Sequence, residues 1–242
     1  MELFRNQIIC LIVISIKVID MYYPLGYPMR LRHLAITLSK LEAHPCENID
    51  FEQYSTDGNI ASQFISSIVS FGDISPDSVV ADLGAGNGIL GIGALKVGAK
   101  KCIFLEVDKK ACEILHNNLL SVGLTESGVI INELLDSETE LSKVDLVICN
   151  PPWGRQKEKA DRPFLNQIIK NGVVSHLMHS SHSTHIQPFF ESRNWNAEKY
   201  DELDFILPAN FSHHREEKAY TKVAFWRLSP NWVYYLTRVL HR

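Results

Sequence analysis

Short apolar segments alternate with helical segments through the middle of the chain, and this alternation limits the possible fold more than any other feature. Strand-like segments rich in β-branched and apolar residues cover residues 79–81, 101–105, 129–134 and 145–149. Helices are expected between them at 89–97 and 109–120. Strands that alternate with helices of about ten residues form βαβ units around a buried parallel sheet. We therefore expect an α/β domain with a mostly parallel sheet and helices on both faces.

The flanking segments complete this domain, which we expect to span residues 29–228. Apolar spacing predicts a helix at 31–41 and a second one around 60–69, with Thr56 or Asp57 as its N-cap. A further helix and the last strands are expected within 164–175, 200–207 and 218–228. Residues 229–242 form a tail.

Residues 1–28 are an N-terminal extension whose status the sequence leaves open. Its apolar run, residues 8–16, is shorter than the ~20 residues that span a bilayer. An extra structural element, a later start at Met21 or Met29, and a targeting segment are the alternatives. We expect no membrane association.

Composition excludes several classes of protein. Hydrophobic residues make up 45% and charged residues 21%, unlike a disordered chain, a collagen-like repeat or a multi-span membrane protein. The net charge of -4 means that any nucleic-acid surface must be a local patch. The five cysteines are scattered without a C-x-x-C pair, which favours reduced thiols in a cytoplasmic protein.

A glycine loop follows the first predicted strand of the alternation. Asp82-Leu83-Gly84-Ala85-Gly86-Asn87-Gly88 leads directly into a helix, where glycines let the backbone approach a ligand closely. Glu106 ends the next predicted strand, where a carboxylate can accept both hydroxyls of a ribose. The spacing therefore predicts a site for a nucleoside-containing cofactor.

Two cofactors fit this loop. The segment from Gly86 to Gly91 satisfies G-x-G-x-x-G, the weak signature of dinucleotide binding, which leaves an NAD-dependent oxidoreductase as one hypothesis. Asp82, two residues before Gly84, favours S-adenosylmethionine instead. The pattern D-x-G-x-G-x-G resembles the first motif of Rossmann-like methyltransferases.

The second motif is Asn150-Pro151-Pro152-Trp153, directly after the predicted strand at 145–149. An exocyclic amino group is a poor nucleophile because its lone pair is delocalised into the ring. The Asn150 side-chain oxygen and the Pro151 carbonyl can accept its two N–H bonds, which orients the nitrogen and stabilises the charge that develops on it. Trp153 offers a flat face on which a flipped-out base can stack.

With both motifs, the chain resembles amino-group methyltransferases with an N-P-P-[FYW] signature, and more narrowly the methyltransferase-like protein 5 family with its archaeal relatives. The resemblance also includes the segments 51–56, 161–165 and 207–209. It implies a Rossmann-like class I S-adenosylmethionine-dependent methyltransferase that acts on N6 of adenine in structured RNA, with rRNA as the expected substrate. N5-glutamine methylation of a protein, which uses the same signature, is the alternative.

The resemblance also assigns residue roles. It implies that the catalytic residues are Asn150, Pro151, Pro152 and Trp153, and that no metal takes part. It implies a cofactor site made of Gln53, Thr56, Asp82, Gly84, Gly86, Asn87, Gly88, Ile89, Glu106, Asn132 and Glu133. Three positions depart from the family pattern: Trp153 replaces Phe, Asn132 replaces Asp, and Glu106 stands where Asp is common.

Three further features carry expectations. Basic residues crowd 155–162, as a phosphate-binding loop or a solvated one. Histidines recur every three residues from His176 to His185; with no cysteine or carboxylate partner evident, RNA contact or exposed polarity is favoured over a metal site. The segment 129–134 should lie at a sheet edge, where the resemblance implies strand addition by a small zinc-binding activator protein.

Overall fold

The computed structural model describes residues 31–43, 56–141, 143–154, 158–206 and 220–231. Within these residues two helices precede the sheet, α2 (Leu31–Leu38) and α3 (Gly58–Phe71). Asp57 is the N-cap of α3, and its carboxylate accepts a hydrogen bond from the Asn59 amide at 2.8 Å. Of the two expected caps, Asp57 is therefore the one used.

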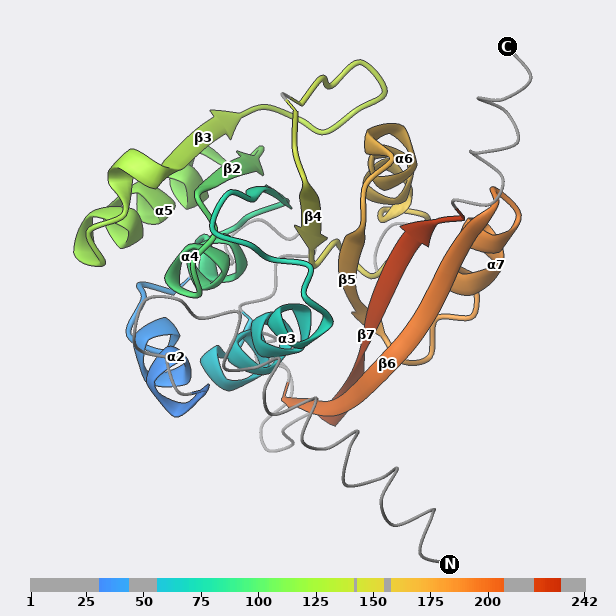
Figure 1. Ribbon diagram of the computed structural model, residues 1–242, viewed down its shortest axis with the longest axis horizontal. Helices are drawn as coiled ribbons and strands as arrows, with labels where there is room; N and C mark the ends of the chain where they lie inside the picture. Colours follow the sequence, from blue (N-terminus) through green and yellow to red (C-terminus); the bar gives the residue numbers. More distant parts are fainter. Residues whose placement is uncertain (1–30, 44–55, 142, 155–157, 207–219, 232–242) are drawn as a thin grey trace, which may run out of the picture. The chain divides into compact units, whose positions relative to one another are not determined.

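The sheet contains β1 (Val79–Leu83), β2 (Lys101–Glu106), β3 (Gly128–Asn132), β4 (Leu146–Cys149), β5 (Ser175–Ser180), β6 (Trp195–Ile206) and β7 (Tyr220–Pro230). Its strand order is β3-β2-β1-β4-β5-β7-β6 (Figure 1). The pairs from β3 to β5 are parallel, and β7 lies antiparallel between β5 and β6. The expected mostly parallel sheet is confirmed, as is the edge position of the third strand.

Helices cover both faces of this sheet, because alternate strand residues point to opposite sides. On β2, Phe104 faces Gly91 of α4 (Ile89–Lys96), so this helix lies close above the strand. Ile103 and Leu105 face the other way, into a core shared with α6 (Arg162–Asn171) and α7 (Ile186–Glu191). The remaining helices are α5 (Lys109–Ser121) and the short η2 (Thr125–Ser127).

The structure corrects the expected element list after residue 164, where it also adds α7 and begins β6 at Trp195 instead of Tyr200. The helix expected to run to residue 175 ends at Asn171, because Gly172 takes the left-handed conformation with φ 68°. Ser175–Ser180 then forms the strand β5, which the sequence analysis missed. Its serines and histidines hide the strand, yet five of its six residues are buried because β4 and β7 flank it.

Several expectations fall outside the described residues. These are Gln53, the extension 1–28, most of the tail and the basic residues Arg155 and Lys157. Within the described part of the chain, no helix is long and apolar enough to cross a membrane.

Candidate active site

The candidate site lies where three strand ends meet. β1 pairs with β2 on one side and with β4 on the other, so the glycine loop, Glu106 and Asn150 follow neighbouring strands at the same edge. The chain order of the strands reverses at β1 and β4, which is where open α/β sheets bind ligands. Both sequence motifs therefore lie at one edge of the sheet.

The backbone of the glycine loop is anchored to β2. The amides of Gly84 and Ala85 both donate to the Leu105 carbonyl, at 2.8 and 3.1 Å. Gly84 has φ +67°, and a Cβ there would stand 2.8 Å from the Phe164 ring of α6. Glycine is required because side-chain-bearing residues rarely adopt this conformation and Phe164 fills the space.

Asp82, a buried residue of β1, links the strand to the helix that follows the glycine loop. Its side chain is buried, and Oδ2 accepts a hydrogen bond from the Gly91 amide at 2.8 Å, which joins β1 to α4. Burial raises the pKa of the Asp82 carboxyl from 3.8 to about 7, against the lowering effect of the Gly91 amide. In this structure Asp82 therefore positions the loop.

Asp82→Asn tests this buried charge. A carboxyl whose pKa is higher in the folded state makes the protein lose stability as pH rises from 3.8 to about 7, by up to ~1.4 kcal/mol per pH unit. Asparagine keeps an acceptor for the Gly91 amide without the charge. We expect the free energy of unfolding of the variant, relative to that of the wild type, to rise by ~2–4 kcal/mol between pH 4.5 and pH 8. Urea unfolding at each pH measures this difference. Asp77→Asn, at an exposed turn, is the control; equal pH slopes for Asp82→Asn and wild type would contradict the assignment.

Glu106 ends β2 with its carboxylate already partly engaged. Oε2 accepts from the Gly86 amide at 2.8 Å, and Oε1 accepts from the Asp108 amide at 2.9 Å. The side chain is buried, and this burial raises the pKa of the Glu106 carboxyl. The Val107 backbone also acts on this carboxylate, and of its roughly four acceptor positions at least one remains for a ligand hydroxyl.

The other expected cofactor residues are placed around these two motifs. Asn132, at the end of β3, donates from Nδ2 to the carbonyls of Glu106 and Val107, which leaves its amide oxygen for a ligand. Asn87 donates to the Glu42 carbonyl at 2.9 Å, so its amide nitrogen holds the loop to the preceding segment. Ile89 is buried at the start of α4, Gly88 is the N-cap of that helix, and Glu133 is exposed.

The Asn150 side chain is held at both ends. Its Nδ2 donates to Thr56 Oγ1 at 3.1 Å, and its Oδ1 accepts from the Trp153 indole N–H at 3.2 Å. These contacts set the orientation of the amide and leave one lone pair of Oδ1 for a further donor. Thr56, expected to touch the cofactor, is buried and positions Asn150.

The histidine repeat contains a cluster that the sequence analysis missed. His176 and His179 are fully buried, so the expectation of exposed polarity is wrong for both; they lie on opposite faces of β5, and both faces are covered. A carboxylate partner also exists, because Asp161 Oδ2 lies 3.2 Å from His179 Nε2 and 2.5 Å from His185 Nε2. The three-residue spacing was the available signal.

His176 belongs to a separate structural network. Its Nε2 lies 2.9 Å from Asp73 Oδ2, and Arg227 donates to both oxygens of that carboxylate. Arg227 and His176 hold the pKa of Asp73 below its usual value, although burial opposes them. This network ties the end of α3 to β5 and β7.

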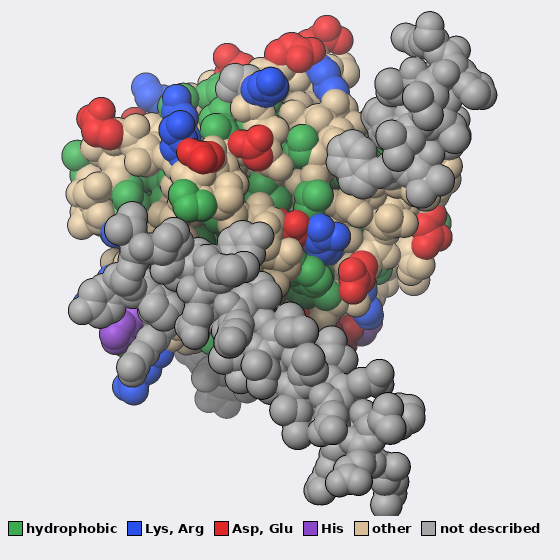
Figure 2. Space-filling model, in the orientation of Figure 1, with side chains coloured by type: hydrophobic (Ala, Val, Ile, Leu, Met, Phe, Trp, Pro, Cys, Tyr) green, Lys and Arg blue, Asp and Glu red, His purple; other side chains and the backbone are tan. Residues whose placement is uncertain are grey.

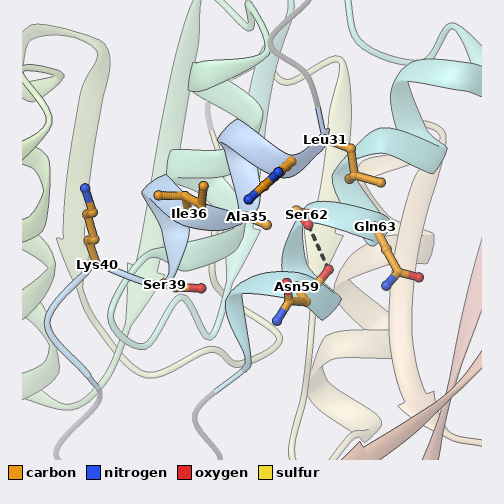
Figure 3. A pocket seen from close by; sticks show the side chains of 9 residues that line it. Leu31, Ala35, Ile36, Ser39, Lys40, Asn59, Ser62 and Gln63 are labelled. Carbon is orange, nitrogen blue, oxygen red and sulfur yellow. Dashed lines mark hydrogen bonds between the residues drawn. The ribbon is translucent and has the colours of Figure 1, made fainter.

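A hollow of about 610 Å³ lies between α2 and α3, away from these motifs in the sequence (Figure 3). Leu31 and Ile36 line it from α2, Lys40 from the turn after α2, and Asn59 and Gln63 from α3. No cluster of titratable groups faces it among its lining residues. It carries no chemistry that we assign.

The fold and this site are those of a Rossmann-like class I methyltransferase. The model of the methyltransferase small domain family matches residues 59–180, and the chain belongs to that family. More closely, it is 30% identical over 210 residues to the rRNA N(6)-adenosine-methyltransferase METTL5 of Danio rerio, covering 84% of this chain and all of that protein. The chain is therefore a member of the METTL5 family.

Archaeal proteins are similar over the same length. An uncharacterized protein of Methanocaldococcus jannaschii is 28% identical, with 81% of this chain and 93% of that protein covered. The crystal structure of a candidate RNA methyltransferase from Pyrococcus horikoshii has a TM-score of 0.75 and 36% identity, covering 84% of this chain and 99% of that one.

Proposed function

We propose that the protein transfers a methyl group from S-adenosylmethionine to the N6 amino group of an adenine in structured RNA, with ribosomal RNA as the substrate. The observation that carries this proposal is the position of Asn150 to Trp153 at the end of β4, beside the glycine loop and Glu106. The name of the Danio rerio relative supports it, because that protein aligns over its full length.

The residues present suit the cofactor. The remaining acceptor capacity of the Glu106 carboxylate suits ribose hydroxyls, and the Asn132 amide oxygen suits the adenine amino group. The backbone at Gly84 and Gly86, both with positive φ, lets the chain pass close beneath the ligand. When bound, the cofactor supplies a methyl group on a sulfonium centre.

Residues of the chain then bind and orient the amino group. Asn150 Oδ1 and the Pro151 carbonyl accept its two N–H bonds and turn the nitrogen lone pair toward the methyl carbon. Positive charge develops on nitrogen as the N–C bond forms and the S–C bond breaks, and the two oxygens stabilise that charge. The amino group loses one proton to solvent, so no strong base is needed.

In vitro methylation of ribosomal subunits tests this proposal. The chain is incubated with labelled S-adenosylmethionine and subunits, and the RNA is then digested for nucleoside mass spectrometry. We expect N6-methyladenosine at one nucleotide. Label on protein instead would favour N5-glutamine methylation, and calorimetric binding of NAD in place of S-adenosylhomocysteine would favour an oxidoreductase.

We further propose a small zinc-binding activator protein as a partner at the free edge of β3. Among the described strands β3 pairs only with β2, and it ends the sheet (Figure 1). Val129 and Leu134 are 36% and 63% exposed there. An added strand would pair the open backbone groups and cover this apolar surface.

Val129→Lys tests this edge. A charge at the centre of the apolar contact should weaken the complex with a recombinant activator at least ~10-fold, measured by calorimetry. Ile36→Lys, at an exposed apolar position of α2, is the control and should bind normally. A clean, fully active monomer that gains nothing from the activator would refute the partnership.

RNA contact and location complete the proposal. Acidic and basic side chains of the described residues are interspersed on the face that Figure 2 shows, so RNA would bind through a local patch. The described cysteines, Cys102, Cys112 and Cys149, are free and buried. Free thiols suit a reducing compartment, and we place the protein in the cytoplasm.

A further inference from the structure

Two buried side chains close to the Asn150 to Trp153 loop, Asp161 and His179, each lack a hydrogen bond that they would ordinarily make. Asp161 is the N-cap residue of α6, yet its carboxylate makes no capping bond and faces two histidines instead. A capping aspartate is ordinarily worth ~1 kcal/mol to its helix. This side chain is buried, so its departure from the helix end indicates a different task.

The second missing hydrogen bond is at His179. Its Nδ1 is 2.6 Å from Ser183 Oγ, while its buried Nε2 has no hydrogen-bond partner within the described residues. Asp161 Oδ2 is near, at 3.2 Å, but lies off the line of a hydrogen bond. A buried polar atom left in this way costs ~1–3 kcal/mol, so another contact must fix the ring.

That contact is with Trp153. The His179 and Trp153 rings are nearly parallel, with an interplanar angle of 26° and centroids 6.2 Å apart. The Trp153 indole N–H in turn donates to Asn150 Oδ1. A line of contacts therefore runs from Asp161 and Ser183 through His179 and Trp153 to Asn150.

The cluster has the geometry of hydrogen bonding and not of ion binding. Donors of a tetrahedral zinc site, each ~2.0–2.1 Å from the ion, stand about 3.3 Å from one another. His185 Nε2 and Asp161 Oδ2 are 2.5 Å apart, closer than two donors of one zinc ion and closer than an ordinary N–H···O hydrogen bond. The direct contact of these two groups favours a shared hydrogen bond over two ligands of one ion.

We propose that His179 is a positioning residue for the methyl-transfer reaction. It packs against one face of the Trp153 ring and so fixes the position of Asn150 Oδ1, which accepts a hydrogen bond from the target amino group. The inference rests on the proposed function. The hydrogen bond with Ser183 orients the His179 ring, and the Asp161 carboxylate lies 3.2 Å from its Nε2.

The kinetic test compares three variants with ribosomal subunits as substrate. His179→Ala should lower kcat about tenfold or more with S-adenosylhomocysteine affinity unchanged, because a small misplacement of the acceptor is costly. His179→Phe keeps a flat ring against Trp153 and should recover most of kcat. His182→Ala, in the same repeat but exposed, is the matched control and should behave as wild type.

A second readout does not depend on any substrate. The chain has four tryptophans, and Trp153→Phe identifies the Trp153 indole N–H signal in a ¹H–¹⁵N spectrum by its disappearance. His179→Ala should shift that signal and speed its hydrogen exchange, while His182→Ala should not. Ser183→Ala should shift it in the same direction and keeps the test open if His179→Ala does not fold.

The outcomes distinguish failure of the His179 role from failure of the proposed function. An unmoved indole signal in His179→Ala and Ser183→Ala overturns the inference whatever the activity, as does wild-type kcat in His179→Ala. Stoichiometric bound metal that Asp161→Asn loses would also overturn it, in favour of a metal site. If the wild type methylates no ribosomal RNA, the proposed function fails, and a shifted signal still supports the contact between His179 and Trp153.

Discussion

Asn150→Ala is expected to lower turnover on ribosomal RNA by ~10²-fold or more while S-adenosylhomocysteine affinity stays within about twofold. The lost oxygen acts on charge that exists only as the N–C bond forms, so its removal affects kcat and not cofactor binding. Single-turnover methylation, with calorimetry for the cofactor, measures the two effects separately.

Two further variants make this result specific. Asn150→Asp keeps an acceptor for the Trp153 indole N–H and for the substrate, and should retain more activity than alanine. Asn117→Ala, at an exposed position of α5, should have no effect. Because Asn150→Ala also leaves Thr56 without its donor, its melting temperature must be checked; near-wild-type turnover in the folded variant would sink the assigned role.

Glu106→Ala is expected to have the opposite profile, with S-adenosylhomocysteine affinity reduced about 10- to 100-fold. A 10- to 100-fold loss is about 1.4–2.8 kcal/mol, less than the ~3–6 kcal/mol of two charged hydrogen bonds, because water can reach the ribose hydroxyls in the alanine variant. Isothermal titration with S-adenosylhomocysteine measures it directly. Unchanged affinity would show that the ribose assignment is wrong.

The controls for Glu106 separate the ligand from the loop. Glu106→Gln keeps one oxygen that can still accept from the Gly86 amide, so a large loss in this variant points to lost ribose contacts and not to a displaced loop. Glu113→Ala, at an exposed position of α5, should bind as wild type.

Local sequence patterns determined the framework of this protein. The glycine loop, Glu106 and Asn150 each follow a predicted strand directly, and parallel strands bring their carboxyl ends to one edge. Spacing alone therefore predicted that these residues share one edge of the sheet, because each strand–loop–helix unit is specified by neighbouring residues. The edge position of the third strand was expected from the doubly wound strand order that such folds adopt.

Only the tertiary structure decided how distant side chains pair. Thr56 holds Asn150 across 94 positions of sequence, and Asn87 bonds to the carbonyl of Glu42 rather than facing solvent. β5 could not be predicted because its serines and histidines do not form an apolar pattern. Such residues can be buried in an interior strand when other elements supply their hydrogen-bond partners.

The cluster behind Trp153 shows the same limit most clearly. Asp161 and the histidine repeat were both apparent in the sequence, but Asp161 occupies a helix start where it would ordinarily cap. Its turn toward His179 and His185 follows from the packing of α6 and α7 on the same face of the sheet. Local propensity specifies which elements form, whereas sheet order and packing decide which side chains meet, because those contacts join segments that no local pattern relates.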